Sequence, residues 1–196
     1  MSGILAEGGV DFLTIETQFS AKEAAIAVDE ARRTGLPIAV NMTYKYTKNR
    51  RTGEIIYRTD WGHSAADLLD FLSGGEFSGG DDLLPHVQLV GLNCGAESRH
   101  VEHTGMLYAV QGTRQMRDAL TERHVDKKLM AYPNAGMPLL DANHLTYYSQ
   151  GPDDMAVILP ELIDAGAFVV GGCCGTTPAH IAAFRQALGS LNVLPE

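Results

Sequence analysis

The sequence is short of cysteine, tryptophan and long apolar runs. Its 196 residues include three cysteines and one tryptophan, and no apolar run approaches the ~20 residues that span a bilayer. The first residues lack both the basic start and the apolar segment of a secretory signal. An odd number of cysteines does not suit a disulfide framework, so we expect reduced thiols in a cytoplasmic protein that binds no membrane.

Positive charge is also scarce, since the net charge is −9. An acidic surface repels phosphate, which argues against nucleic acid as a partner. The basic residues are concentrated between Arg32 and Arg58, where the net charge is +6, whereas the rest of the chain carries −15. The part of this stretch at 43–58 predicts either a solvated hairpin or a surface for an anionic ligand or partner protein.

Five short apolar segments alternate with helical segments, which predicts βα units on a parallel sheet and therefore an α/β fold. The predicted strands are 11–16, 37–42, 87–92, 128–132 and 167–171. None alternates strictly between apolar and polar residues, so we expect burial on both faces of the sheet. No linker divides the chain, and we expect a single domain over 1–196.

The predicted helices have recognisable ends. Ser20 with Glu23 and Ser64 with Asp67 are typical of helix starts, and Thr177 precedes a proline that suits a first helical position. The predicted helices are 20–35, 64–74, much of 98–122, 153–165 and a last one from 177. Pro160 predicts a kink or a split in the fourth helix. The stretch 43–62 predicts a hairpin, and 133–152 reads as irregular.

Each predicted strand ends in polar or thiol side chains. In parallel α/β folds the carboxyl ends of the strands face one crevice, so these side chains are expected to converge. The strand endings are Glu16-Thr17, Asn41 with Thr43, Asn93-Cys94, Asn134 and Cys173-Cys174.

The three cysteines predict a metal site. Cys94, Cys173 and Cys174 supply three soft ligands and leave a fourth position open, as in catalytic zinc sites. Glycines at 171, 172 and 175 allow the turn that brings adjacent cysteines to one ion. Cys94 alone also suits an inert buried thiol. A redox disulfide is disfavoured, because adjacent cysteines close a strained ring.

Three further residues are candidates for substrate binding. Glu16 closes an apolar strand and is expected to face the crevice, although a salt bridge in the core explains it equally well. Asn93 and Asn134 suit either ligand contacts or turns and caps. A turn at 133–138 is expected to place Gly136 at positive φ. The seven histidines show no metal-binding i, i+4 pair, and we expect solvated or structural roles for them.

Four segments resemble the homocysteine S-methyltransferase family: 11–17, Gly91-Leu92-Asn93-Cys94, Tyr132 to Gly136, and 171–181. The resemblance implies a zinc-containing (β/α)8 TIM barrel in which Cys94, Cys173 and Cys174 bind Zn²⁺. It further implies that a thiol acceptor, homocysteine, takes the fourth position and is converted to methionine. By its family position, Glu16 would bind the amino group of the acceptor.

The five predicted units correspond to the last five of such a barrel, and the first three have no counterpart here. Five strands cannot close an eight-stranded barrel, so we expect a partial barrel: a fragment of a longer protein, a half completed by a partner chain, or an oligomer that covers its edges. The methyl donor is open: a corrinoid, betaine, S-methylmethionine or another donor. Two alternatives remain, a corrinoid-linked methyltransferase with a different acceptor or donor, and a non-catalytic zinc-binding half-domain that needs a partner.

Overall fold

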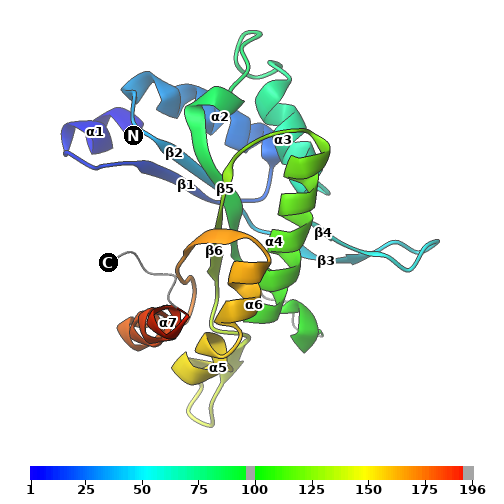
Figure 1. Cartoon of the computed structure of the whole chain (residues 1–196), viewed down its shortest axis with the longest axis vertical. Coiled ribbons are helices and arrows are strands. Elements are labelled where there is room, and N and C mark those ends of the chain that lie inside the picture. Colours follow the sequence, from blue (N-terminus) through cyan, green and yellow to red (C-terminus); the bar gives the residue numbers. More distant parts are fainter. Residues whose placement is uncertain (96–99, 192–196) are drawn as a thin grey trace.

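A five-stranded parallel sheet forms the centre of the computed structural model, which describes residues 1–95 and 100–191 (Figure 1). The strands are β1 (Leu13–Gln18), β2 (Ile38–Met42), β5 (Val87–Cys94), β6 (Lys128–Pro133) and β9 (Ala167–Val170), and they lie side by side in this order. All neighbouring pairs are parallel. The predicted α/β fold is confirmed, and each predicted strand is present with shifts at its ends.

Helices connect the strands and cover the sheet. They are α1 (Ser2–Glu7), α2 (Ala21–Ala31), α3 (Ala65–Ser73), α4 (Gly105–Glu122), α5 (Pro152–Ala156), α6 (Leu159–Asp164) and α7 (Pro178–Ser190). Short 3-10 turns lie at Arg32–Thr34, Leu84–His86 and Val101–His103. Within the described ranges, no helix has both the length and the apolar character needed to cross a lipid bilayer.

The helix starts follow the capping signals. The hydroxyl of Ser20 accepts a bond from the backbone of Glu23, and Ser64 and Asp67 form a reciprocal capping box. Pro160 lies in the first turn of α6 and divides the predicted helix 153–165 into α5 and α6. Helix α4 fills most of the predicted stretch 98–122, of which 98 and 99 lie outside the described residues. Helix α1 was not predicted.

One row of the sheet faces the helices and forms the core. Val40, Val90 and Leu129 are register partners across β2, β5 and β6, and all three are buried. The neighbouring row begins with Thr14 on β1 and reaches Lys128 on β6, and both of these residues are exposed. The expectation of burial on both faces therefore holds for β2 but is wrong for β1 and β9, because among the described residues each pairs along one edge.

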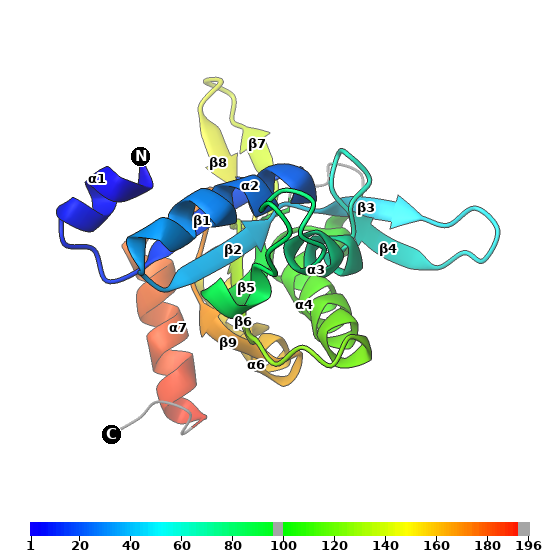
Figure 2. The same cartoon turned by 90° about the horizontal axis from the view of Figure 1, so that it is seen from above.

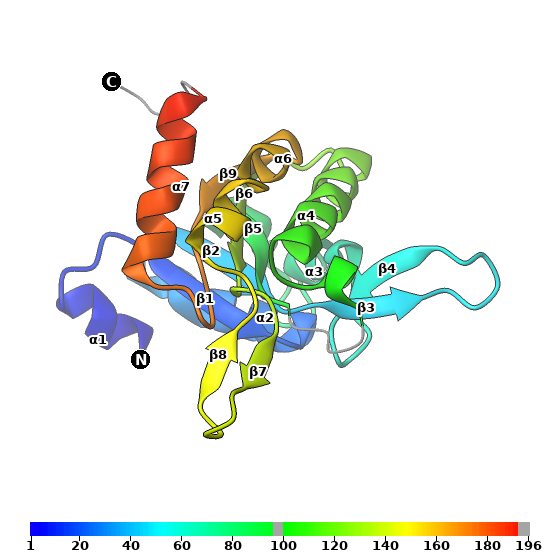
Figure 3. The ribbon, with the colours of Figure 1, turned by 90° about the horizontal axis from the view of Figure 1, so that it is seen from below.

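Two antiparallel hairpins project from the carboxyl ends of the parallel strands. The hairpin of β3 (Lys45–Lys48) and β4 (Ile55–Arg58) follows β2, and that of β7 (Pro138–Leu140) and β8 (Thr146–Tyr148) follows β6. They point in different directions, and β3–β4 lies on the side opposite to α1 and α7 (Figures 2 and 3). The first hairpin was predicted. The second replaces part of the stretch 133–152 that the sequence marked as irregular.

Candidate metal centre

The structure brings the three cysteine sulfurs together. Cys94 is the last residue of β5, and Cys173 and Cys174 lie between β9 and α7. The three Sγ atoms lie within 4.8 Å of one another, and those of Cys173 and Cys174 are 3.9 Å apart. A tetrahedral zinc ion with bonds of about 2.3 Å spaces its sulfur ligands about 3.8 Å apart. The donor set and its spacing therefore fit a thiolate-binding metal ion with a small inward adjustment.

Strand β6 holds the two cysteine segments in place, because it lies between β5 and β9 in the sheet. The backbone N–H of Asn134 donates to the carbonyl of Cys94 at 3.2 Å. The N–H of Cys173 donates to the carbonyl of Pro133 at 2.8 Å, and the N–H of Ala135 donates to that of Cys174 at 2.9 Å. One backbone segment therefore fixes both halves of the cysteine cluster.

Two backbone features turn the thiols out of their strands. Cys94 has φ of +60°, a left-handed conformation that breaks the alternation of side chains along β5. Gly175 has φ of +80°, which glycine adopts without steric cost. Gly171 serves close approach instead, since a Cβ atom there would lie 2.6 Å from the Tyr132 ring. These positions agree with the predicted role of the glycines.

The three cysteine thiols differ in pKa. A hydrogen bond from the Cys94 thiol lowers the pKa of Cys173 to about 5, and the Asn93 amide adds to this effect. The same hydrogen bond, together with burial, raises the pKa of Cys94. Burial and the charge of Cys173 raise the pKa of Cys174. Without a metal ion, the cluster holds one thiolate and two thiols at neutral pH.

Glu16 lies at the edge of the cluster. The Nδ2 atom of Asn93 lies 3.4 Å from Glu16 Oε1 and 3.7 Å from Cys173 Sγ, so the carboxylate and the thiolate contact the same amide. Partial burial and the charge of Cys173 raise the pKa of Glu16. Among the described residues no basic side chain forms an ion pair with Glu16, so the core salt bridge considered from the sequence is absent there.

Asn134 is buried in the turn that follows β6. Its Nδ2 atom donates to the carbonyl of Gly136 at 3.0 Å, and Gly136 has φ of +76° as predicted. Its Oδ1 atom is buried and has no hydrogen-bond partner in the part of the chain that the structure describes. Asn134 therefore has a structural bond and one unused acceptor, and its contact with substrate stays a prediction.

Tyr148 lies beside the cysteines and was not predicted. Its ring packs against the backbone of Gly175, where any Cβ atom would overlap with it. Burial and the charge of Cys174 raise the pKa of Tyr148. Tyr147 and Tyr148 could not be distinguished without the fold, because neighbouring residues of a strand point to opposite faces.

Three histidines make structural hydrogen bonds, in agreement with their predicted roles. His180 Nδ1 accepts from the backbone N–H of Thr177 at 3.1 Å, and its Nε2 atom lies 3.1 Å from the Gln150 carbonyl. His63 Nδ1 accepts from the backbone N–H of Ala21 at 2.9 Å. His103 Nδ1 lies 2.6 Å from the hydroxyl of Tyr57.

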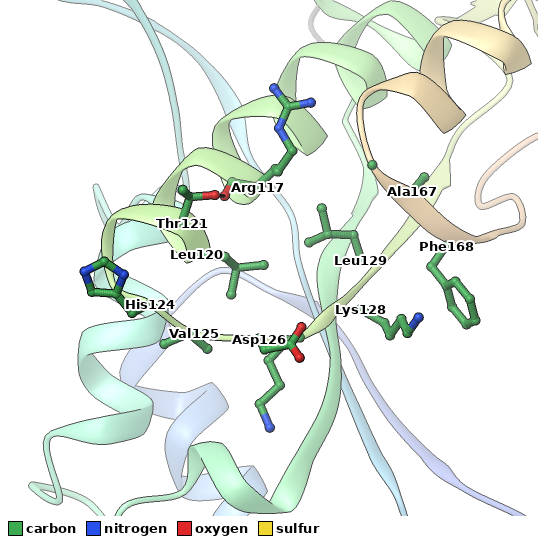
Figure 4. Close-up of a pocket in the computed structure, with 12 residues that line it drawn as sticks. Arg117, Leu120, Thr121, His124, Val125, Asp126, Lys128, Leu129, Ala167 and Phe168 are labelled. Atoms are coloured by element: carbon green, nitrogen blue, oxygen red, sulfur yellow. Dashed lines mark hydrogen bonds between the residues drawn. The ribbon is translucent and has the colours of Figure 1, made fainter.

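A cavity of about 490 Å³ lies at the other end of the sheet, where β6 and β9 begin (Figure 4). Its lining includes Arg117, Thr121, Lys128 and Phe168. The Nζ atom of Lys128 lies 4.1 Å from the centre of the Phe168 ring. Parallel α/β folds carry their chemistry at the carboxyl ends of the strands, so this cavity is not the candidate site despite its size.

The sequence model that defines the homocysteine S-methyltransferase family matches residues 1–188 of this chain. This range includes every residue of the centre described above. The chain belongs to the homocysteine S-methyltransferase family. A methionine synthase of Mycobacterium leprae (strain TN) is 29% identical over 199 residues, and one of Mycobacterium tuberculosis (strain ATCC 25618 / H37Rv) is 28% identical over 198 residues. These alignments cover 96% and 95% of this chain.

Solved structures of this family share the fold. The apo form of the homocysteine methyltransferase MmuM from Escherichia coli superposes with a TM-score of 0.59 at 23% identity, over 93% of this chain. Its metallated form gives 0.58 at 23% identity, over 94% of this chain. The five-stranded parallel sheet of this chain thus corresponds to part of a (β/α)8 barrel, as predicted.

The chain is much shorter than these relatives. It spans 13% and 14% of the two methionine synthases and 52% of the chain of apo MmuM. The comparisons therefore establish the family and the fold for a chain that spans only part of these relatives.

Proposed function

We propose that this chain carries the acceptor-activating part of a zinc-dependent S-methyltransferase that methylates homocysteine and forms methionine. The single observation that carries the proposal is the cluster of three Sγ atoms within 4.8 Å of one another at the carboxyl end of a parallel sheet. A bound zinc ion supplies positive charge that keeps an acceptor thiol deprotonated at neutral pH. Reduced thiols also fit the expected cytoplasmic location.

Different residues of the chain bind the metal ion and the acceptor. Cys94, Cys173 and Cys174 hold the ion and leave one side of it open for the acceptor sulfur. Glu16 binds the ammonium group of the acceptor, because its carboxylate shares a hydrogen-bonding amide with the Cys173 thiolate and has no cationic partner among the described residues. Asn134 contributes its Oδ1 atom, which has no partner among the described residues, as an acceptor for a polar group of the ligand.

We also propose that a partner chain, or a further copy or segment, completes the barrel. In the described residues, β1 and β9 each leave one edge without a neighbouring strand, and such edges pair readily with other strands. The mass of the active species, determined by light scattering during chromatography, tests this part of the proposal.

The experiment that tests the function combines metal analysis with a methyl-transfer assay. We expect about one zinc ion per chain and formation of methionine from homocysteine with one member of a donor panel that includes betaine, S-methylmethionine and methylated corrinoid. Because the chain spans only part of its relatives, it is assayed both alone and together with candidate partner chains. Zinc-free protein that still methylates homocysteine at the full rate contradicts the proposal.

A second candidate function is supported by the β3–β4 hairpin. Lys48, Arg50 and Arg51 form no ion pair with any described residue. The hairpin leaves the sheet at the carboxyl end of β2, on the same end as the cysteines. These features favour a corrinoid-linked transferase whose methyl donor is held by an acidic partner protein.

Charge reversal separates the two candidates. The double change Arg50→Glu and Arg51→Glu slows transfer from a protein-bound donor and leaves transfer from a small free donor unchanged if the second candidate is correct. Arg50→Glu alone is compared with Lys22→Glu on α2, a control outside the hairpin that changes the net charge by the same amount. Zinc binding without transfer from any donor, with or without partner chains, favours a non-catalytic half-domain.

A further inference from the structure

Asn93 is fully buried, and both polar atoms of its side-chain amide form hydrogen bonds. Its Oδ1 atom accepts from the backbone N–H of Thr17 and from the hydroxyl of Thr43, both at 3.1 Å. Its Nδ2 atom lies 2.7 Å from Thr17 Oγ1 and faces Glu16 and Cys173. A backbone N–H can only donate, so the bond to Thr17 fixes which end of the amide faces the cysteines.

The segment that Asn93 holds is strained. Thr17 has φ of +60°, a conformation that β-branched residues rarely adopt and that costs of order 1–3 kcal/mol. The pairing of β1 with β2 also loses its regular register between Ile15 and Gln18. Both the backbone N–H and the hydroxyl of Thr17 are bound to Asn93. The amide therefore stabilises an irregular turn in β1 that the local sequence disfavours.

This irregularity has a geometric consequence for Glu16. A bulge near the end of a strand redirects the adjoining side chain, and such bulges occur beside active sites. Here the redirected carboxylate lies 3.4 Å from the same amide nitrogen that faces the Cys173 sulfur. One buried side chain thus sets the position of the acceptor-binding carboxylate relative to a metal-binding thiolate.

We propose that Asn93 is the positioning residue of this centre: it holds Glu16 in place through the Thr17 turn and hydrogen-bonds the Cys173 thiolate, without contacting the acceptor. This inference rests on the proposed function and gives Asn93 a different role from the direct substrate contact expected from the sequence. Outer-shell hydrogen bonds of this kind orient metal ligands and tune their charge.

The test uses the full chain loaded with Co²⁺, whose thiolate charge-transfer absorption reports both metal binding and the arrival of the acceptor sulfur. In Asn93→Ala we expect the homocysteine concentration for half-maximal spectral change to rise about 10-fold or more, and the absorption of the acceptor-free complex to shift. Thr43→Val is the matched control, because it removes the other bond to Oδ1 and leaves Nδ2 in place. It is expected to change homocysteine binding less than about twofold.

A rescue experiment separates positioning from general loss of structure. Glycine adopts positive φ without steric cost, so Thr17→Gly added to Asn93→Ala is expected to recover part of the lost homocysteine affinity but not the shifted absorption. If Asn93→Ala does not fold, Asn93→Ser with and without Thr17→Gly gives the same comparison. Equal homocysteine binding by Asn93→Ala and Thr43→Val overturns the inference. If homocysteine does not change the absorption spectrum of the cobalt-loaded wild-type chain, the proposed function is overturned instead.

Discussion

The two ends of the parallel sheet differ in how their polar groups are used. At the carboxyl end, three thiols, a carboxylate and the buried amide of Asn93 come from three different strand ends and lie within one network. At the amino end, Arg117, Lys128 and other polar groups line a cavity with Phe168, and the described contacts are local (Figure 4). The cavity at the amino end is therefore not where the reactive groups converge.

The difference follows from the direction of the strands. The connections after the strands of a parallel sheet leave from one end, and they carry the irregular backbone that aims side chains at a shared point. The left-handed residues Thr17 and Cys94 lie at this end, but His124, which lines the cavity at the amino end, is left-handed as well. The convergence of thiol, carboxylate and amide groups, rather than cavity volume or backbone strain alone, therefore marks the candidate site.

The largest expected effect is the loss of metal binding when a ligand is removed at the carboxyl end. Cys94→Ala and Cys174→Ala are each expected to weaken zinc binding by more than about 100-fold, beyond the effect of losing an outer-shell partner. Competition with a chromophoric chelator measures the affinity. Thr121→Ala, in the cavity at the amino end, is the control and is expected to bind zinc normally. Full-strength zinc binding by either cysteine variant contradicts the assignment of the ligands.

The contrast between the ends is also visible in how well the sequence predicted each region. The five parallel strands were found because each is a continuous apolar run, and the cysteine cluster was found because its glycines imply a turn. The β7–β8 hairpin was missed, since its strands have three residues each and are largely exposed. Short exposed strands have no apolar pattern that a sequence can reveal.

The second prediction concerns protons at the carboxyl end. Cys173 is a thiolate at pH 7 with its pKa near 5, whereas the raised pKa values of Cys94 and Cys174 keep both protonated. Zinc binding is therefore expected to release about two protons, and zinc affinity to fall about 100-fold from pH 7 to pH 6. Calorimetry in buffers of different ionisation enthalpy counts the protons. Release of three protons, or of none, contradicts the uneven sharing between the thiols.

The details of the centre could not be read from the sequence, because they depend on long-range register. Asn93 was expected either to contact substrate, which stays untested, or to hold a turn. Its bonds to Thr17 and Glu16 depend on the bulge in β1, which no local sequence pattern predicts. Tyr148 reaches Gly175 through the hairpin that follows a different strand. Residue types were therefore predictable from chemistry, whereas their pairwise roles required the fold.

The third prediction examines the turn after the cysteine pair. Gly175→Ala is expected to destabilise the protein by about 1–3 kcal/mol, because the new methyl group requires positive φ and overlaps with the Tyr148 ring. Gly35→Ala is the matched control, since Gly35 has φ of +71° with nothing near the added atom. Urea unfolding of both variants separates backbone strain from overlap. If Tyr148→Ala fails to restore stability to Gly175→Ala, the overlap is not the cause.

The smallest expected effect belongs to the amino end. Lys128 Nζ lies over the face of Phe168, a contact worth about 0.5–1 kcal/mol at an exposed site. Lys128→Ala is therefore expected to lower the free energy of unfolding by that amount and to leave zinc affinity unchanged. Lys127→Ala removes a neighbouring charge of the same cavity that has no such ring contact, so it isolates the contribution of the ring. The Lys128 side chain lies at the end of the sheet away from the cysteines. A change in zinc affinity in Lys128→Ala greater than about twofold would therefore mean that the amino end influences the metal centre, and the separation of the two ends would no longer hold.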